Sequence, residues 1–232
     1  MFKPDDNNFE QSHFAAVLAL TKENLEKYRK EEKALSDELY TLLETYGAKD
    51  VEALSMIDNL QVMYERARHE ASRAERARQK PFFGRIDFVD DKHKSNDTIY
   101  IGKVGISRDV THLEVIDWRA PVANSYYESH IGEVTYSVPR EGDFVIDLKK
   151  KRTYEIKDDT LLSFFDSDVV ANDELLNRYL SQNKKAVLGE IIATIQKEQN
   201  DIIRQSPYKS IIVQGAAGSG KTTVAMHRIS YI

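Results

Sequence analysis

The feature that most constrains this chain is a glycine-rich stretch near its C-terminal end. A short apolar run at residues 211–213 precedes Gly215, and after four further residues the chain continues Gly-Lys-Thr at 220–222. This spacing is the phosphate-binding P-loop pattern, which is specific when a strand precedes it and a helix follows. We expect residues 211–213 to form a buried strand and residues 223–232 to begin a helix.

Each residue type in this stretch has a chemical reason. Glycines let successive backbone N–H groups turn inward around a phosphate, and a helix N-terminus adds the positive end of its dipole. Lys221 would bring a charge to the β- and γ-phosphates, and the Thr222 hydroxyl would ligate Mg²⁺. From this chemistry we expect ATP and Mg²⁺ as cofactors. The alternative is a glycine-rich turn in which the lysine occurs by chance. The predicted nucleotide-binding residues are Gln199, Gly215, Ala216, Ala217, Gly218, Ser219, Gly220, Lys221, Thr222 and Thr223, with Thr222 also the metal ligand.

Gln199 is included because it stands sixteen residues before Gly215. Its amide carries one donor group and one acceptor, so it can pair with both N6 and N7 of adenine. A lone glutamine on a helix is more often simply solvent-facing.

The N-terminal third has a helical repeat. Apolar residues recur in alternating steps of four and three from Phe14 to Tyr46, with Thr21 and Glu32 as exceptions, and Gly47 ends the run. A second such series extends from Ile57 to Ala74. Sustained repeats of this kind are typical of coiled coils. Because only a short turn separates the two, we expect an antiparallel coiled-coil arm, on the order of 55 Å long at about 1.5 Å per residue.

The predicted arm is electrically uneven. Residues 37–60 carry six acids and one base, whereas residues 66–80 carry six bases and two acids. Charge runs are usually solvated surface, and that alternative stays open here. A tip of one sign could instead enter a basic or metal-containing cavity of a partner. The candidate partner-binding residues at the tip are Glu44, Asp50, Glu52 and Asp58.

Beyond Pro81 the apolar pattern changes to period two, which predicts an antiparallel, barrel-like β unit of many short strands. Expected strands are residues 83–89, 98–104, 113–116, 122–127, 133–137, 144–148 and 153–156. The basic run at residues 149–152 is expected at a hairpin tip. Residues 117–121, Asp-Trp-Arg-Ala-Pro, contain the only tryptophan and are expected to form a core anchor beside an ion pair. Helical periodicity returns from Asn172, a plausible N-cap.

Composition narrows the setting. The 232 residues include no cysteine, and the six histidines (13, 69, 93, 112, 130 and 227) have no metal-ligand spacing. No apolar run approaches the ~20 residues of a membrane-spanning helix. We therefore expect a cytoplasmic protein with no membrane partner. The predicted fold class is α+β, with an arm at 1–80, a β unit at 81–166, and a helical segment and incomplete RecA-like P-loop domain at 167–232.

Two resemblances follow from these motifs. Residues 195–199 (Ile-Gln-Lys-Glu-Gln) before the glycine-rich stretch, and His-Arg-Ile at 227–229 after it, resemble the start of a UvrD/Rep-type superfamily 1 helicase. There, the residue matching Gln199 belongs to the adenine-reading Q motif. The long extension before it, with its arm, residues 82–87 (Phe-Phe-Gly-Arg-Ile-Asp) and residues 117–121, resembles the HelD family of bacterial RNA polymerase recycling ATPases.

The HelD resemblance implies an arm that enters the secondary channel of core RNA polymerase, and an ATP-driven motor that releases the enzyme from nucleic acid. Two other interpretations stay open: a DNA-unwinding helicase whose arm recruits a partner, and a polymerase-binding module without enzymatic activity. A P-loop ATPase also needs a later acidic strand end and a group that positions water. We therefore expect this chain to be the N-terminal portion of a longer motor, with no turnover by itself.

Overall fold

The computed structural model describes residues 2–4, 6–46, 51–90, 92, 95–109, 111–128, 130–166 and 198–232. The predicted N-cap at Asn172 and its helix lie outside these residues. No helix in the described ranges is both long and apolar enough to cross a membrane. In chain order, the elements are α1 (Asn7–Tyr46), α2 (Val51–Gln79), β1 (Gly84–Asp90), β2 (Ser95–Gly102), β3 (Ile106–Ser107), β4 (Leu113–Asp117), the 3-10 helix η2 (Pro121–Tyr127), β5 (Gly132–Val138), β6 (Gly142–Lys157), β7 (Thr160–Asp166) and α5 (Lys221–Tyr231).

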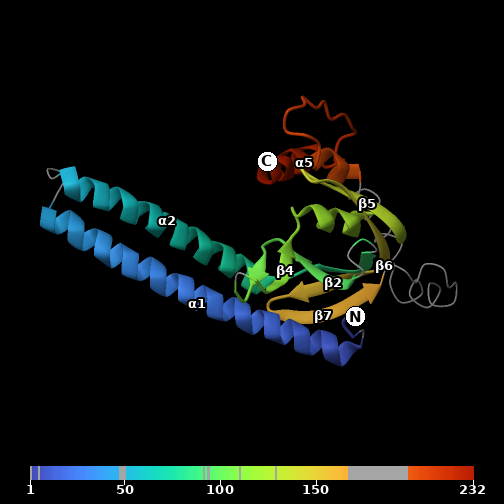
Figure 1. Ribbon diagram of the computed structural model, residues 1–232. Coiled ribbons are helices and arrows are strands. Elements are labelled where there is room, and N and C mark those ends of the chain that lie inside the picture. The colour runs from blue at the N-terminus through green and yellow to red at the C-terminus, as the bar shows by residue number, and fades with distance from the viewer. Residues whose placement is uncertain are drawn as a thin grey trace.

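Both predicted long helices are present, and they pack along each other in opposite directions (Figure 1). The predicted apolar positions of α1 are buried or half-buried from Phe14 to Leu42, and only Tyr46 at the end is exposed. Facing them on α2 are small and aliphatic side chains, so that Leu35 packs with Leu60 and Ala67. α2 ends at Gln79 because Pro81 cannot continue a helix. We call α1 and α2 together the helix pair.

The β unit is one curled sheet in the order β3-β4-β2-β1-β6-β5, with β7 added beside β6 (Figure 1). Most pairs are antiparallel, as the alternating pattern predicts, but β2 and β4 run parallel, with Ile101 beside Ile116. The expectation of a wholly antiparallel unit is therefore wrong at this pair.

The basic run at 149–152 does not form a hairpin tip. It lies inside β6, a continuous strand of 16 residues that pairs with β1, β5 and β7. Lys151 and Arg152 are only 9% and 2% exposed, because Lys151 donates to the Glu128 carbonyl and Arg152 pairs with Asp166. Partners on neighbouring elements thus bury charges that the sequence alone would place in solvent.

The expected strand at 122–127 is also wrong, since these residues form the 3-10 helix η2. Pro121 occupies its first turn, where the missing N–H costs nothing and the fixed φ favours a helical turn. Ala123 and Ser125 are both fully buried. Their two-residue spacing is also the spacing of a half-buried strand, which explains the incorrect prediction.

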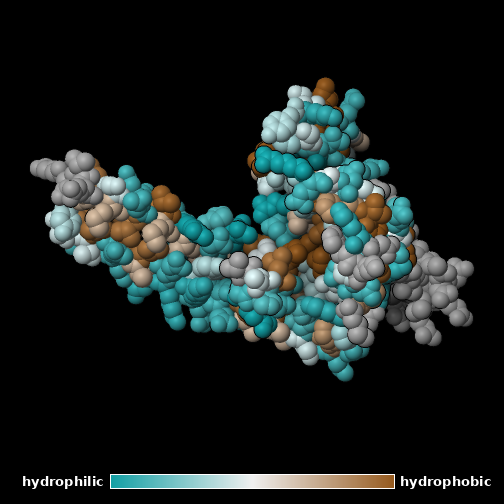
Figure 2. Space-filling view, viewed as in Figure 1, coloured by the Kyte–Doolittle hydropathy of each residue, from teal (hydrophilic) through white to brown (hydrophobic). Residues whose placement is uncertain are grey.

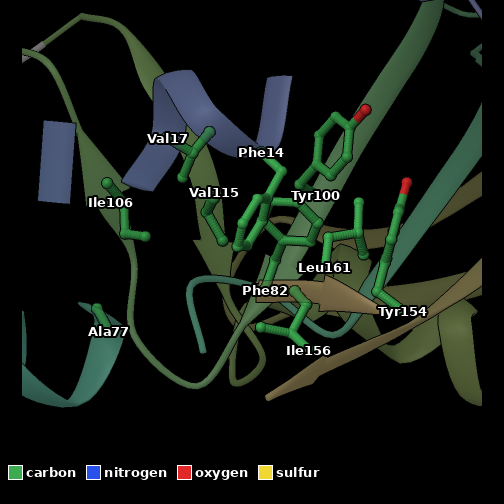
Figure 3. Packing of buried hydrophobic residues seen from close by; sticks show 10 residues of the cluster. All are labelled: Phe14, Val17, Ala77, Phe82, Tyr100, Ile106, Val115, Tyr154, Ile156 and Leu161. Carbon is green, nitrogen blue, oxygen red and sulfur yellow. The ribbon is translucent and has the colours of Figure 1, made fainter. Parts of the chain in front are cut away.

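The sheet buries side chains on both faces. One face packs on the base of the helix pair, where Phe14 and Val17 of α1 and Ala77 of α2 meet Phe82, Tyr100 and neighbouring apolar residues (Figure 3). The other face packs around Ala123 of η2. The helix pair is thus part of the same core as the sheet at its base, while its distal half extends away from the sheet (Figure 1).

A buried charge cluster secures this base. Glu10 of α1 has no exposed surface. Its Oε1 accepts hydrogen bonds from Arg85 and Arg152, and its Oε2 accepts from the hydroxyls of Tyr154 and Tyr100. Burial, the neighbouring Tyr100 and the Glu10 carboxylate raise the pKa of Tyr154 above its ordinary value, so the hydroxyl stays a donor. Each buried charge has a partner of opposite sign, as burial requires.

Candidate nucleotide site

The predicted nucleotide-binding residues form a glycine-rich loop that leads into α5. Gly218 and Gly220 have φ of 82° and 83°, a region that favours glycine because a Cβ is strained there. Gly220 is the N-cap of α5, and Val224 N–H donates to its carbonyl at 2.9 Å. The loop therefore presents backbone to solvent directly at a helix N-terminus.

Lys221 is the first residue of α5, and its side chain folds back into the loop. Its Nζ donates to the carbonyls of Gly215 at 2.9 Å and Ala216 at 2.6 Å. The ammonium group therefore lies within the loop itself. From this position a cation would reach the oxygens of a phosphate bound at the loop.

Gln199 lies against the same loop. Its Nε2 donates to the Ser219 carbonyl at 3.3 Å, and a Cβ added at Gly220 would lie only 2.7 Å from that nitrogen. A side chain at position 220 would therefore displace the Gln199 amide from this contact. The structure therefore places Gln199 beside the loop, although sixteen residues separate it from Gly215 in the sequence.

The remaining predicted residues belong to this loop or to the first turn of α5. Ala216, Ala217, Thr222 and Thr223 are exposed, and Ser219 N–H donates to the Ala216 carbonyl at 3.2 Å. Within the described ranges, no group of three or more His, Asp or Glu side chains is arranged to hold a metal ion. A Mg²⁺ ion here would therefore depend on Thr222 and on the phosphates that it accompanies.

The strand expected at residues 211–213 is not formed. These residues have no strand assignment, and Ile212 is 95% exposed. A parallel strand of this kind needs neighbouring strands to pair its backbone. The described residues contain none beside it, which is the physical reason for the difference.

Arg228 connects α5 to the helical segment at residues 198–203. Its Nη1 donates to the carbonyls of Ile202, Ile203 and Gln205, and its Nη2 donates to the Ser206 carbonyl at 3.0 Å. Ile202 and Ile203 lie in the last turn of this helix, and Gln205 and Ser206 follow shortly after it. The guanidinium therefore holds the helix of Gln199 against the helix of Lys221. In the sequence, His-Arg-Ile at 227–229 stands out only through its resemblance to helicases.

Residues 117–121 have the features expected of them. Trp118 packs against the core on the η2 face of the sheet, and the Arg119 guanidinium pairs with Asp117 at 2.6 Å. Burial alone would raise the pKa of Asp117, but the hydrogen bonds from Arg119 outweigh it and hold that pKa below its ordinary value. The ion pair is therefore maintained at neutral pH.

The predicted tip residues are less fully placed. Glu44 near the end of α1 and Asp58 on α2 are exposed. Asp50 lies outside the described residues, and Glu52 is within α2 but its side chain is not among those described. The structure therefore puts two of the four carboxylates on the distal surface of the helix pair.

A search of curated proteins returned no match for this chain. A scan against family models matched residues 8–183 to the model described as "DNA helicase IV HelD, N-terminal domain". The match covers the helix pair and the whole sheet, well over half of the chain. The chain therefore belongs to the HelD N-terminal domain family.

Proposed function

We propose that this chain binds Mg-ATP at residues 215–223 as the start of a RecA-like domain, and binds core RNA polymerase through the helix pair. The observation that carries the ATP site is the Lys221 ammonium inside a glycine loop, at the N-terminus of α5. A cytoplasmic location is part of the same proposal, since both proposed ligands are cytoplasmic in bacteria. The proposed division of the chain is a coiled-coil arm at 1–80, the β unit at 81–166 and the P-loop portion at 167–232.

In this proposal each residue has one role. The backbone N–H groups of the loop and the Lys221 ammonium hold the phosphates, the Thr222 hydroxyl ligates Mg²⁺, and Gln199 pairs with adenine. ATP supplies the phosphoryl group whose transfer to water drives the motor. The exposed apolar side chains of Ile212, Met226 and Ile229 suit packing against further strands of a RecA-like sheet.

The polymerase proposal depends on the distal surface of the helix pair. Apolar side chains are exposed there, with Met56 56% and Val62 70% exposed, and Figure 2 shows apolar residues among polar ones along this part. Glu44 and Asp58 add negative charge. An apolar surface with charge of one sign suits a protein partner with a basic cavity better than it suits nucleic acid.

ATP binding is tested by equilibrium dialysis of the chain with labelled ATP and Mg²⁺. We expect saturable binding that Lys221→Ala abolishes, because that substitution removes the charge that reaches the phosphates. Lys209→Ala is the matched control, since Lys209 is exposed and lies outside the loop. Equal binding by the chain and by Lys221→Ala would contradict the proposed site.

Polymerase binding is tested by biolayer interferometry with purified bacterial core RNA polymerase. We expect binding by the chain, and loss of binding when residues 36–66 are replaced by a short turn. Binding of polymerase without any binding of ATP would instead identify a recruitment module.

A second candidate is a DNA-unwinding helicase with a partner-recruiting arm, because the matching family is described as a DNA helicase. Binding to a forked DNA duplex, with none to core RNA polymerase, would favour this candidate. The same immobilised chain can be exposed to both ligands, so the comparison is direct.

A further inference from the structure

The sheet meets residues 198–232, which we call the nucleotide-binding segment, at residues 117–120. These residues are the end of β4 and the turn that follows it. Arg204, directly after the helical segment at 198–203, donates to three consecutive carbonyls of this turn. These are Trp118, at a short distance, Arg119 at 3.4 Å and Ala120 at 3.3 Å. A planar guanidinium can satisfy several carbonyls at once, which a lysine ammonium does not do with the same geometry.

The same guanidinium also lies close to two aromatic rings, which contact each other. Its central carbon is 5.9 Å from the ring centroid of Trp118 on the sheet, and 5.3 Å from that of Tyr231 at the end of α5. Burial lowers the pKa of Arg204 below its ordinary value, although the side chain stays charged at neutral pH. Arg204 therefore joins the sheet, the segment that carries Gln199 and α5.

Trp118 makes further contacts with one face of α5. Its ring centroid lies 5.9 Å from that of His227, edge to face, and 6.2 Å from that of Tyr231. Arg119 Nη1 donates to the Ser230 carbonyl at 3.3 Å. His227 and Tyr231 are four residues apart and so lie on the same side of the helix. The C-terminal half of α5 therefore rests on the turn, while its N-terminus carries Lys221.

The helical segment at 198–203 contacts both the glycine-rich loop and η2. Gln199 reaches the glycine loop, whereas its neighbour Asn200, 4% exposed, donates to Asn124 of η2 and accepts from Arg204 Nε at 3.0 Å. Adjacent residues of one short helix thus contact the proposed ATP site and η2, which packs on the sheet. Buried amides with both partners in place fix the orientation of the helix that carries them.

We propose that the nucleotide-binding segment docks on the turn at 117–120. In this arrangement Arg204 is a positioning residue that couples ATP binding at the loop to the sheet. The inference depends on the proposed ATP site. Phosphate binding would draw Lys221 away from the carbonyls of Gly215 and Ala216, and α5 is one rigid element from Lys221 to Tyr231. A displacement at its N-terminus therefore reaches Trp118 at its other end.

Trp118 is the only tryptophan of the chain, so its emission reports this junction directly. We expect Mg-ATP to change the Trp118 emission of the full chain. In Arg204→Lys we expect this change to be lost and the affinity for ATP, measured separately by equilibrium dialysis, to fall about fivefold or more, the usual lower bound of such coupling. Arg108→Lys is the matched control, because Arg108 is on the sheet surface and 64% exposed.

Two further measurements make the outcome decisive. Hydrogen exchange at β1 and β6 checks that Arg204→Lys keeps the sheet intact. Arg119→Lys, at an exposed position that contacts Ser230, should weaken the emission change in the same direction. Unchanged ATP affinity and emission response in both variants would overturn the coupling while leaving the ATP site standing. Absence of ATP binding by the unmodified chain would overturn the ATP site, and the coupling with it.

Discussion

Oε1 of Glu10 on α1 lies 2.6 Å from Nη1 of Arg85 on β1, and neither side chain has any exposed surface. Arg85 also pairs with Asp87 at 2.8 Å. Buried charges of opposite sign therefore attach the helix pair to the sheet. A buried charge left without its partner is strongly destabilising. The attachment is therefore sensitive to single substitutions.

Glu10→Gln should lower the free energy of unfolding by about 3 kcal/mol, the low end of the range for breaking a buried pair, because Arg85 keeps Asp87. Urea titration followed by circular dichroism measures the change. Glu38→Gln on the exposed side of α1 is the matched control. A loss below about 1 kcal/mol for Glu10→Gln would mean that the cluster contributes little.

His13 should make stability depend on pH. Burial, with Lys3 and Arg85 nearby, lowers the pKa of His13 to about 3 from its ordinary value near 6.5. Between these values the unfolded chain binds a proton that the folded chain does not. The free energy of unfolding therefore falls as pH decreases through this window, and the contribution of His13 is fully present above it.

His13→Phe keeps a ring against Tyr100 and removes the proton-binding group. We expect its stability to fall less steeply than that of the unmodified chain between pH 6.5 and 4, by up to about 1.4 kcal/mol per pH unit. Urea midpoints at pH 7, 5.5 and 4.5 give the comparison. Identical slopes for the two proteins would contradict this assignment.

Leu35→Ala should test the packing within the helix pair. Leu35 is 8% exposed and packs with Leu60 and Ala67, so the truncation should cost about 2–5 kcal/mol. Leu43→Ala is the matched control, because Leu43 is 48% exposed on the same helix. Hydrogen exchange along α1 measures both. Equal protection in the two variants would indicate a different register.

Removal of charge at the distal end should slow association with RNA polymerase. Glu44→Gln, Asp50→Asn and Glu52→Gln together remove three negative charges while keeping side-chain shape. We expect a lower on-rate for core RNA polymerase, with the difference shrinking as salt rises. The matched control removes three exposed acids near the base: Glu23→Gln, Glu26→Gln and Glu31→Gln.

Surface plasmon resonance at two ionic strengths compares the two triple variants. Helix content should be unchanged in both. Equal on-rates at low salt would show that the distal acids are only solvated surface.

The helices could be predicted from the sequence because their signal is local. Alternation of three and four residues marks the buried side of α1 without reference to any partner, and Pro81 marks the end of α2. The uninterrupted course of β6 could not be predicted, because its interior contains Lys151 and Arg152. Their burial depends on Glu128, Asp166 and Glu10, which are distant in sequence.

The glycine-rich loop likewise combines a feature that can be predicted from the sequence with features that cannot. Its spacing predicts a helix over residues 223–232, and α5 forms there, beginning two residues earlier at Lys221. The strand before it could not form, since strands need neighbours that no local pattern supplies. Arg204 carried no sequence signal either, because its role depends on the turn at Trp118, more than eighty residues earlier in the chain.

The Glu10 cluster lies at one end of the helix pair, and this has a mechanical consequence. Beyond Glu10, α1 continues for 36 residues, which at about 1.5 Å each is a lever of about 54 Å. A tilt of about 3° at a pivot near Glu10 would then move the far end by about 3 Å. A small change at the buried Glu10 cluster would thus be amplified at the far end of the helix pair.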